Sequence, residues 1–165
     1  EFRRVLFRSM SRIIGIDPGT GILGFGVIEV GTKPILVDAG VIRTPVKQQD
    51  SQRLMTIFDE LKELITELKP NIMAVEKLFF AQNVTTAMSV SQARGVVLLL
   101  GMQHGLDLYE YTPLQIKQAM TGYGRADKKQ IQEMVRLQLG LKTVPKPDDA
   151  ADALACAITC SMSMR

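Results

Sequence analysis

The sequence predicts an α/β domain in which a mixed five-stranded sheet is flanked by helices. Three strand-like segments rich in Val and Ile follow one another near the start of the chain. Further strand-like segments then alternate with segments whose apolar residues recur every three or four positions, which is the period of a helix. Hairpin-linked strands followed by strand–helix crossovers produce a sheet with antiparallel and parallel pairs and with helices on both faces.

The first half of the domain supplies three strands and one helix. Residues 12–17 are an apolar run, and residues 24–30 and 34–42 are two β-branched runs separated by a short Gly-Thr-Lys segment, which predicts a hairpin. Residues 51–68 carry Leu, Ile and Phe at helical spacing. This helix ends before Pro70, because proline lacks the N–H that a helix interior needs.

The second half alternates strands with helices. Residues 71–75 are a short buried strand, residues 84–104 a long helix, and residues 106–111 another strand. The long helix is apolar on more than one face, which is typical of a core helix and also suits a dimer interface. Three helices complete the chain, at residues 113–120, 127–139 and 148–162.

Length and composition indicate one globular domain. The chain has 165 residues, of which 46% are hydrophobic and 22% are charged, and these are ordinary values for a protein with a full core. We expect residues 1–9, EFRRVLFRS, to be a non-native leader and residues 10–165 to form a single domain. The longest strongly apolar run, residues 96–102, is too short to span a bilayer, so no membrane partner is expected.

Net charge alone does not point to nucleic acid. The chain is formally +3, but the leader holds three arginines and one glutamate, which leaves only +1 for the rest. The distribution is more informative, because basic residues outnumber acidic ones between Lys117 and Lys142. Such a stretch is suited to contact phosphates. Taken alone, however, a solvated helix face explains it better.

The cysteines and the histidine suggest structural roles. Cys156 and Cys160 lie four residues apart in a predicted helix, which matches neither a disulfide framework nor a four-ligand zinc site. We expect them to be buried, reduced thiols. His104 is the only histidine and precedes Gly105 at a predicted helix end, where a contact with the helix C-terminus is expected.

Four carboxylates stand out because they lie at the ends of predicted elements. Asp17 directly follows the first buried strand, and Glu76 follows a later one in the same way. Asp149 and Asp152 lie three residues apart at the start of the last helix, so both project from one face. Helix capping, with Asp148 as the N-cap, explains Asp149 well but explains Asp152 poorly.

The two strands that precede Asp17 and Glu76 would bring these side chains to one edge of the sheet if the strands are adjacent and parallel. Three or four carboxylates that converge without a cation repel one another and raise each other's pKa. Hard divalent cations such as Mg²⁺ or Mn²⁺ relieve this repulsion. Two such ions about 3.5–4 Å apart activate a water and stabilise the leaving oxygen in phosphodiester cleavage. The acids therefore indicate a two-metal nuclease site.

The stretch IDPGTG, residues 16–21, has other interpretations when it is taken alone. A plain turn is one of them. A phosphate-binding loop is another, because actin-like ATPases and sugar kinases also open with a strand that ends in D-x-G-T. Those folds normally need two such halves and a much longer chain than 165 residues, so this alternative is disfavoured.

Four motifs, in this order and spacing, resemble those of one nuclease family. They are IDPGTGILGFGVIE, VEKLFFAQN, GYGRADKKQI and DDAADALACAI. Together they are similar to the RuvC family of Holliday-junction resolvases, and the likeness extends from residue 12 to about residue 162. It implies an RNase H-like fold and a homodimer that cuts two opposing strands of a four-way DNA junction with Mg²⁺ or Mn²⁺. It also implies a cytoplasmic location and a branch-migration motor as a partner.

The resemblance also implies roles for individual residues. It places the acidic tetrad of the family on four positions, Asp17, Glu76, Asp149 and Asp152. The aromatic residue that contacts bases near the crossover falls on Phe79. The DNA-binding basic residues fall on Lys117, Arg125 and Lys128. The alternative is a non-catalytic junction-binding protein, and the intact acids argue against it.

Overall fold

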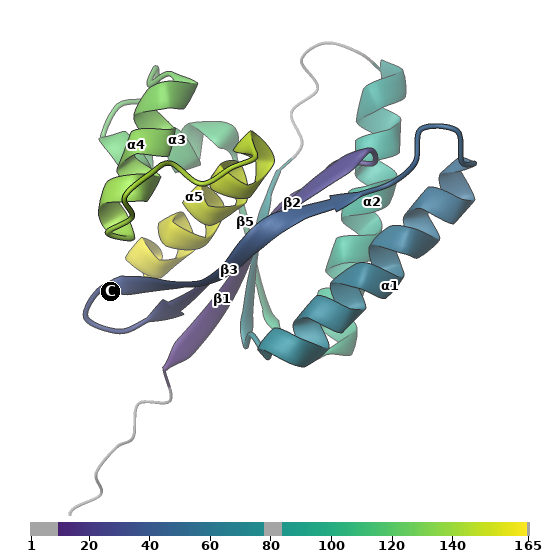
Figure 1. Ribbon diagram of the computed structural model, residues 1–165, viewed down its shortest axis with the longest axis horizontal. Helices are drawn as coiled ribbons and strands as arrows, with labels where there is room; N and C mark the ends of the chain where they lie inside the picture. Colours follow the sequence, from purple (N-terminus) through teal and green to yellow (C-terminus); the bar gives the residue numbers. More distant parts are fainter. Residues whose placement is uncertain (1–9, 78–83, 165) are drawn as a thin grey trace, which may run out of the picture.

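The computed structural model describes residues 10–77 and 84–164, which form a five-stranded sheet between two layers of helices (Figure 1). The strands are β1 (Ser11–Asp17), β2 (Ile22–Val30), β3 (Pro34–Arg43), β4 (Ile72–Glu76) and β5 (Asp107–Tyr111). The helices are α1 (Asp50–Leu68), α2 (Val84–Gln103), α3 (Pro113–Thr121), α4 (Lys128–Gln138) and α5 (Asp148–Ser163). The predicted fold class is confirmed, and the predicted boundaries agree to within two residues.

β1 is the central strand of the sheet, whose order is β3-β2-β1-β4-β5. It pairs antiparallel with β2 and parallel with β4, while β2–β3 is antiparallel and β4–β5 is parallel. Helices cover both of its faces, so Ile13 packs in the core under α5 while Ile14 and Ile16 pack in the core with α1 and α2. This two-sided burial explains why β1 is a continuous apolar run.

The helices are divided between the two faces, with α1 and α2 on one and α3, α4 and α5 on the other (Figure 1). The amphipathic α1 buries Ile57 and Leu61 completely. In contrast, α5 is buried almost all round from Ala153 to Cys160. It lies in the middle of its layer, against β1 and β2 on one side and against α3 and α4 on the other.

Three glycines of β1 and β2 allow α5 to lie unusually close to the sheet. A Cβ atom on Gly15 would lie 2.1 Å from the carbonyl oxygen of Ala153, and one on Gly24 would lie 2.1 Å from that of Asp149. A Cβ on Gly26 would lie 2.5 Å from Leu154 Cγ. All three distances are far below van der Waals contact, so only glycine permits this approach.

The helix starts show one prediction that is correct and one that is wrong. Asp127 caps α4, because its side chain accepts a hydrogen bond from the Gln130 N–H at 2.9 Å. Asp148 does not cap α5, because Pro147 occupies the N-cap position and Asp148 is the first helical residue. Helix α5 therefore begins one residue earlier than a capping aspartate requires, which leaves the Asp148 side chain available for other contacts.

The predicted roles of the histidine and the cysteines are confirmed. The Nδ1 atom of His104 lies 2.9 Å from the carbonyl oxygen of Leu100, in the last turn of α2. Cys156 and Cys160 are buried free thiols in α5. Burial raises the pKa of the Cys156 thiol well above its ordinary value, which makes this group unreactive.

Helix α2 is rich in apolar residues, above all in its second half. By length and composition, α2 as a whole could cross a membrane. The strongly apolar run at residues 96–102 within it is too short to do so. The helix is built into the fold, however, because Ala93, Val97 and Leu100 are fully buried in the core that α1 completes. Large apolar side chains on the opposite side stay exposed, among them Met88, Leu99 and Met102.

We predict that Gly24→Ala lowers the free energy of unfolding by about 2–4 kcal/mol, as overpacking against rigid backbone does. The added methyl group would overlap the Asp149 carbonyl, and α5 would have to move away from the sheet. Urea denaturation measures this change. Gly31→Ala is the matched control, because a Cβ there would meet its nearest atom, Met10 Cε, at an ordinary 3.5 Å. Equal stability of the two variants would contradict the account.

Candidate active site

Asp17 and Glu76 lie side by side at one edge of the sheet. β1 and β4 pair in parallel with Ile16 opposite Val75, so the next residue of each strand reaches the same edge. This is the adjacency that the sequence analysis required, and it is confirmed. The carboxyl ends of parallel strands are the usual location of ligand sites in such sheets.

The start of α5 adds two acids to the same edge. Gly24 pairs with Asp17 across β2 and β1, and Gly24 also underlies the backbone of Asp149. Asp149 is thereby placed next to Asp17, and Asp152 follows one turn later on α5. The structure therefore brings all four predicted acids together from three separate elements, β1, β4 and α5.

The acids are close enough to alter one another's protonation. Burial, which is the largest cause, and the charges of Glu76, Asp152 and Asp149 together raise the pKa of Asp17 to about 8. Burial and the charge of Asp152 also raise the pKa of Glu76. The pKa of Asp152 is raised too, mainly by burial and against the opposing effect of Lys128. Such perturbed carboxyl groups in a cleft are typical of functional sites.

The segment that follows Asp17 is held in place by hydrogen bonds to Thr44, which lies between β3 and α1, and to α2. The Thr44 hydroxyl donates to the Thr20 carbonyl oxygen at 2.5 Å, and Arg53 Nε donates to the Thr44 hydroxyl at 2.9 Å. The Thr20 and Ser89 hydroxyls are also hydrogen-bonded to each other. Gly19 is needed for the turn, because a Cβ there would lie 2.1 Å from the Ile22 carbonyl oxygen. IDPGTG is thus a fixed turn beside the acids.

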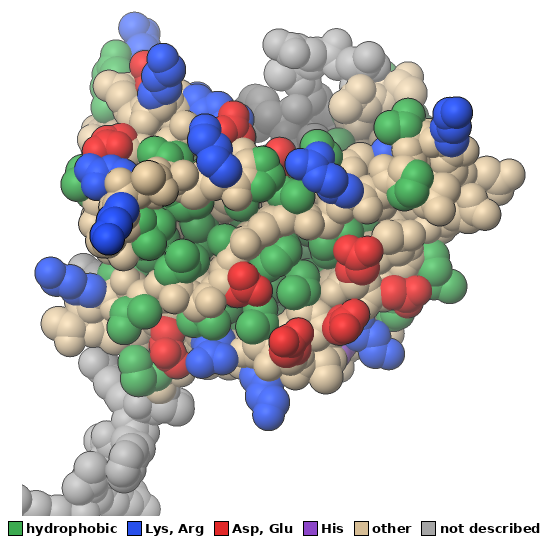
Figure 2. Space-filling model, in the orientation of Figure 1, with side chains coloured by type: hydrophobic (Ala, Val, Ile, Leu, Met, Phe, Trp, Pro, Cys, Tyr) green, Lys and Arg blue, Asp and Glu red, His purple; other side chains and the backbone are tan. Residues whose placement is uncertain are grey.

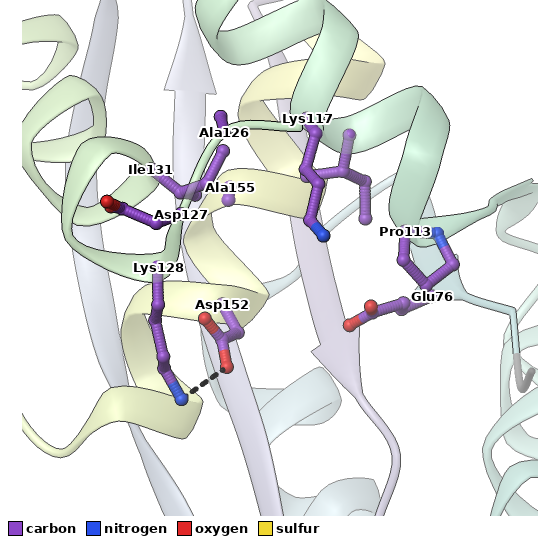
Figure 3. A pocket seen from close by; sticks show the side chains of 10 residues that line it. Glu76, Pro113, Lys117, Ala126, Asp127, Lys128, Ile131, Asp152 and Ala155 are labelled. Carbon is purple, nitrogen blue, oxygen red and sulfur yellow. Dashed lines mark ion pairs between the residues drawn. The ribbon is translucent and has the colours of Figure 1, made fainter. Parts of the chain in front are cut away.

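A pocket of about 270 Å³ opens beside the acids, between β4, α3, α4 and α5. Its floor is apolar, and its rim carries Glu76, Asp152, Lys117 and Lys128 (Figure 3). Lys128 Nζ lies 3.4 Å from Asp152 Oδ2. Lys117 is close enough for its charge to lower the pKa of Glu76 partway back. Two predicted DNA-binding lysines therefore lie at the carboxylate cluster itself.

The remaining predicted DNA-binding residues are farther from the acids or outside the described chain. Arg125 is exposed in the loop between α3 and α4. Phe79 lies outside the described residues, so its role stays a prediction. In the view of Figure 2, Lys and Arg side chains gather over α3, α4 and the upper edge of the sheet, while most Asp and Glu side chains lie over the lower half.

Asp148 is the residue whose role the sequence analysis missed. Its carboxylate pairs with Lys128 and with Lys146, each at 3.5 Å, and accepts a hydrogen bond from Gln132 Nε2 at 3.1 Å. The only feature of the sequence that could have suggested an ion pair for Asp148 is the group of basic residues that follows Asp127. They do not show that α4 and α5 bring Lys128 and Asp148 together.

The residues fit divalent cations by their donor type. All four acids offer oxygen ligands, which Mg²⁺ and Mn²⁺ prefer, and their mutual repulsion is the condition that a cation relieves. Among residues 10–77 and 84–164, no three Asp, Glu, His or Cys side chains are already gathered tightly enough to hold an ion. A cation at this cluster would therefore require small movements of the carboxylate side chains.

The mixed sheet, with acids at the carboxyl ends of β1 and β4 and at the start of α5, defines an RNase H-like nuclease. The model of one family, crossover junction endodeoxyribonuclease RuvC, matches residues 13–160. The chain belongs to this RuvC family. It is therefore a hydrolase of the crossover junction endodeoxyribonuclease type, and the sugar-kinase alternative is set aside.

Bacterial relatives are similar over nearly their full length. The crossover junction endodeoxyribonuclease RuvC of Heliobacterium modesticaldum is 53% identical over 153 residues, which is 92% of this chain and 94% of that protein. The Desulfitobacterium hafniense protein of the same name is 58% identical over 147 residues, 88% and 89% of the two chains. Thermus thermophilus RuvC, solved in complex with a Holliday junction substrate, superposes with a TM-score of 0.89 at 37% identity, covering 94% and 95% of the two chains.

We predict that, without divalent metal, the protein loses stability as the pH rises from about 4 to about 8. The Asp17 carboxyl has a pKa of about 8 in the folded protein, against 3.8 for an ordinary aspartate. In that window the unfolded state has lost its proton while the folded state retains it, so raising the pH favours unfolding. One such proton changes the free energy of unfolding by at most ~1.4 kcal/mol per pH unit.

Thermal and urea unfolding in EDTA at several pH values measure this slope. Asp17→Asn should flatten it, because asparagine does not ionise, and Mg²⁺ should offset it in the parent protein. Asp59→Asn, a change at an exposed acid of α1, should leave the slope unchanged. If the stability of the parent protein in EDTA rises between about pH 4 and about pH 8, the raised pKa of Asp17 is wrong.

Proposed function

We propose that this chain resolves four-way DNA junctions by paired symmetric cuts that use two divalent cations, Mg²⁺ or Mn²⁺. The proposed ligands are Asp17, Glu76, Asp149 and Asp152. One observation carries the proposal: these carboxylates converge from β1, β4 and α5, and burial together with their charges raises the pKa of Asp17 to about 8. The T. thermophilus relative, solved with a Holliday junction substrate, supports the choice of DNA.

The chemistry proposed for the site is hydrolysis of a phosphodiester bond. When bound, the two cations supply an activated water and stabilise the charge on the leaving oxygen. The parallel pairing of β1 and β4 fixes the backbone positions of Asp17 and Glu76, so their carboxylates need only small movements to reach the cations. Lys117 and Lys128 at the pocket rim are placed to contact the phosphate oxygens. The proposed products carry a 5′-phosphate and a 3′-hydroxyl, which a ligase can rejoin.

Binding of the junction is proposed to involve residues around this centre. Lys117, Arg125 and Lys128 come from α3, the following loop and α4, and they would contact the DNA backbone. Phe79, outside the described residues, would stack on an unpaired base near the crossover. Base stacking on an aromatic ring contributes about 1–3 kcal/mol.

We further propose a homodimer formed through α2. Met88, Leu99 and Met102 are 63%, 54% and 67% exposed, and their spacing places them along one stripe of the helix. Gly95, in the same stripe, is exposed with no atom within 4 Å of a built Cβ, so a second helix has room to approach. A junction with two scissile strands needs two active sites, which twofold pairing supplies.

The cellular setting is also a proposal. The relatives described above are bacterial proteins, and we propose that this chain acts in the cytoplasm during DNA recombination and repair. A branch-migration motor complex is the proposed protein partner. A non-catalytic junction-binding role is disfavoured, because binding alone would not need four mutually repelling acids at one edge of the sheet.

Cleavage of a synthetic four-way junction tests the proposal. With Mg²⁺, the parent protein should cut two opposing strands at symmetric positions, and EDTA should abolish cutting. Asp17→Asn should bind the junction but cut it more than about 100-fold more slowly, because a shared metal ligand is lost. Substantial Mg²⁺-dependent cutting by Asp17→Asn would contradict the metal assignment.

A second variant separates the dimer from the chemistry. Leu99→Lys places a charge in the exposed stripe of α2, near the C-terminal end of the helix. The variant should become monomeric by analytical ultracentrifugation and should lose the pairing of the two cuts. If Leu99→Lys remains a dimer with paired cuts, the α2 interface is wrong, while the metal assignment stands.

A further inference from the structure

Lys128 lies between two acids that have different surroundings. Its Nζ atom is 3.4 Å from Asp152 Oδ2 and 3.5 Å from Asp148 Oδ2. Asp152 belongs to the carboxylate cluster that interacts with Asp17 and Glu76, and Figure 3 shows the lysine directed toward it. Asp148 lies at the outer end of the same helix and is 47% exposed. The lysine therefore links the cluster to an acid outside it.

Asp148 is held by α4 and by the segment that precedes α5. It is the first residue of α5, it accepts a hydrogen bond from Gln132 of α4 at 3.1 Å, and it pairs with Lys146 at 3.5 Å. Helix capping does not occupy its carboxylate, because Pro147 stands at the N-cap. The Asp148 carboxylate is thus a pre-positioned partner for the ammonium of Lys128.

We propose that Asp148 is a positioning residue that holds Lys128 against Asp152 in the free protein and competes with the DNA phosphate for the same ammonium group. The inference rests on the proposed phosphate contact of Lys128. Asp148 thereby weakens junction binding slightly. Before the substrate binds, it keeps the positive charge of Lys128 beside the negatively charged carboxylate cluster.

The energetics allow this exchange. Lys128 is the first residue of α4 and its side chain is 54% exposed, so its flexible stem can redirect the ammonium group. Ion pairs with this exposure contribute little to stability, because water screens the two charges. A phosphate oxygen, which forms a stronger charge-assisted hydrogen bond, can replace the Asp148 carboxylate. Breaking the pair is therefore a small cost rather than a barrier.

A double-mutant cycle on junction affinity tests the proposal. Binding of a synthetic four-way junction is measured in EDTA for the parent, Asp148→Asn, Lys128→Met and the double variant. Asp148→Asn should bind about two- to fivefold more tightly, the factor that corresponds to one exposed ion pair. In the Lys128→Met background the same change should have no effect, because the shared lysine is absent.

The controls separate positioning from general charge effects. Asp107→Asn removes one negative charge at the start of β5, the end of the strand that lies away from Glu76. It should change affinity by less than about 1.5-fold at the same ionic strength. Asparagine retains the oxygen that accepts from Gln132, and urea unfolding checks that Asp148→Asn stays folded.

Two results would overturn the inference. A gain in affinity that persists in the Lys128→Met background would show that Asp148 acts by repelling DNA or through its second partner, Lys146, and not through Lys128. Unchanged or weaker binding by Asp148→Asn would show that the two groups do not compete. If the parent protein itself fails to bind or cut the junction, the proposed function fails first, and the two failures are thus distinguishable.

Discussion

The close approach of α5 to β1 and β2 is the constraint on which the rest of the structure depends. Gly15, Gly24 and Gly26 form a floor without side chains, and the backbone of α5 rests on it where a Cβ atom would not fit. Small residues along α5, such as Ala153 and Ala157, complete the contact. Because of this approach, the first turn of α5 arrives directly beside the end of β1. The acidic centre is thus a consequence of packing.

The same packing forces the protein to keep an electrostatically unfavourable cluster. Buried carboxylates that raise each other's pKa oppose folding at neutral pH. The apolar cores on both faces of the sheet supply the stability that tolerates this cost. Lys128 offsets part of it from α4, and divalent cations would offset the rest. The site is therefore prepared for positive charge before any ligand binds.

The sequence was sufficient for the fold because local signals and the global arrangement agree. β1 is apolar on both faces since it is central, and Asp17 and Glu76 end strands that pair in parallel. The close helix–sheet contact was not predictable, because it depends on where α5 crosses the sheet rather than on any local pattern. The ion pair of Asp148 with Lys128 was missed for a similar reason, since two helices bring these residues together across 20 positions. The Asp148 cap failed because Pro147 holds the N-cap position.

The central claim is that four acids from three elements form one cation site. Anomalous X-ray diffraction from crystals grown with Mn²⁺ tests it most directly, because the signal locates the ions independently of any assumed ligand. The account predicts two Mn²⁺ peaks bounded by the carboxylates of Asp17, Glu76, Asp149 and Asp152. Mn²⁺ found only elsewhere, or no peak at these carboxylates at millimolar Mn²⁺, would contradict it.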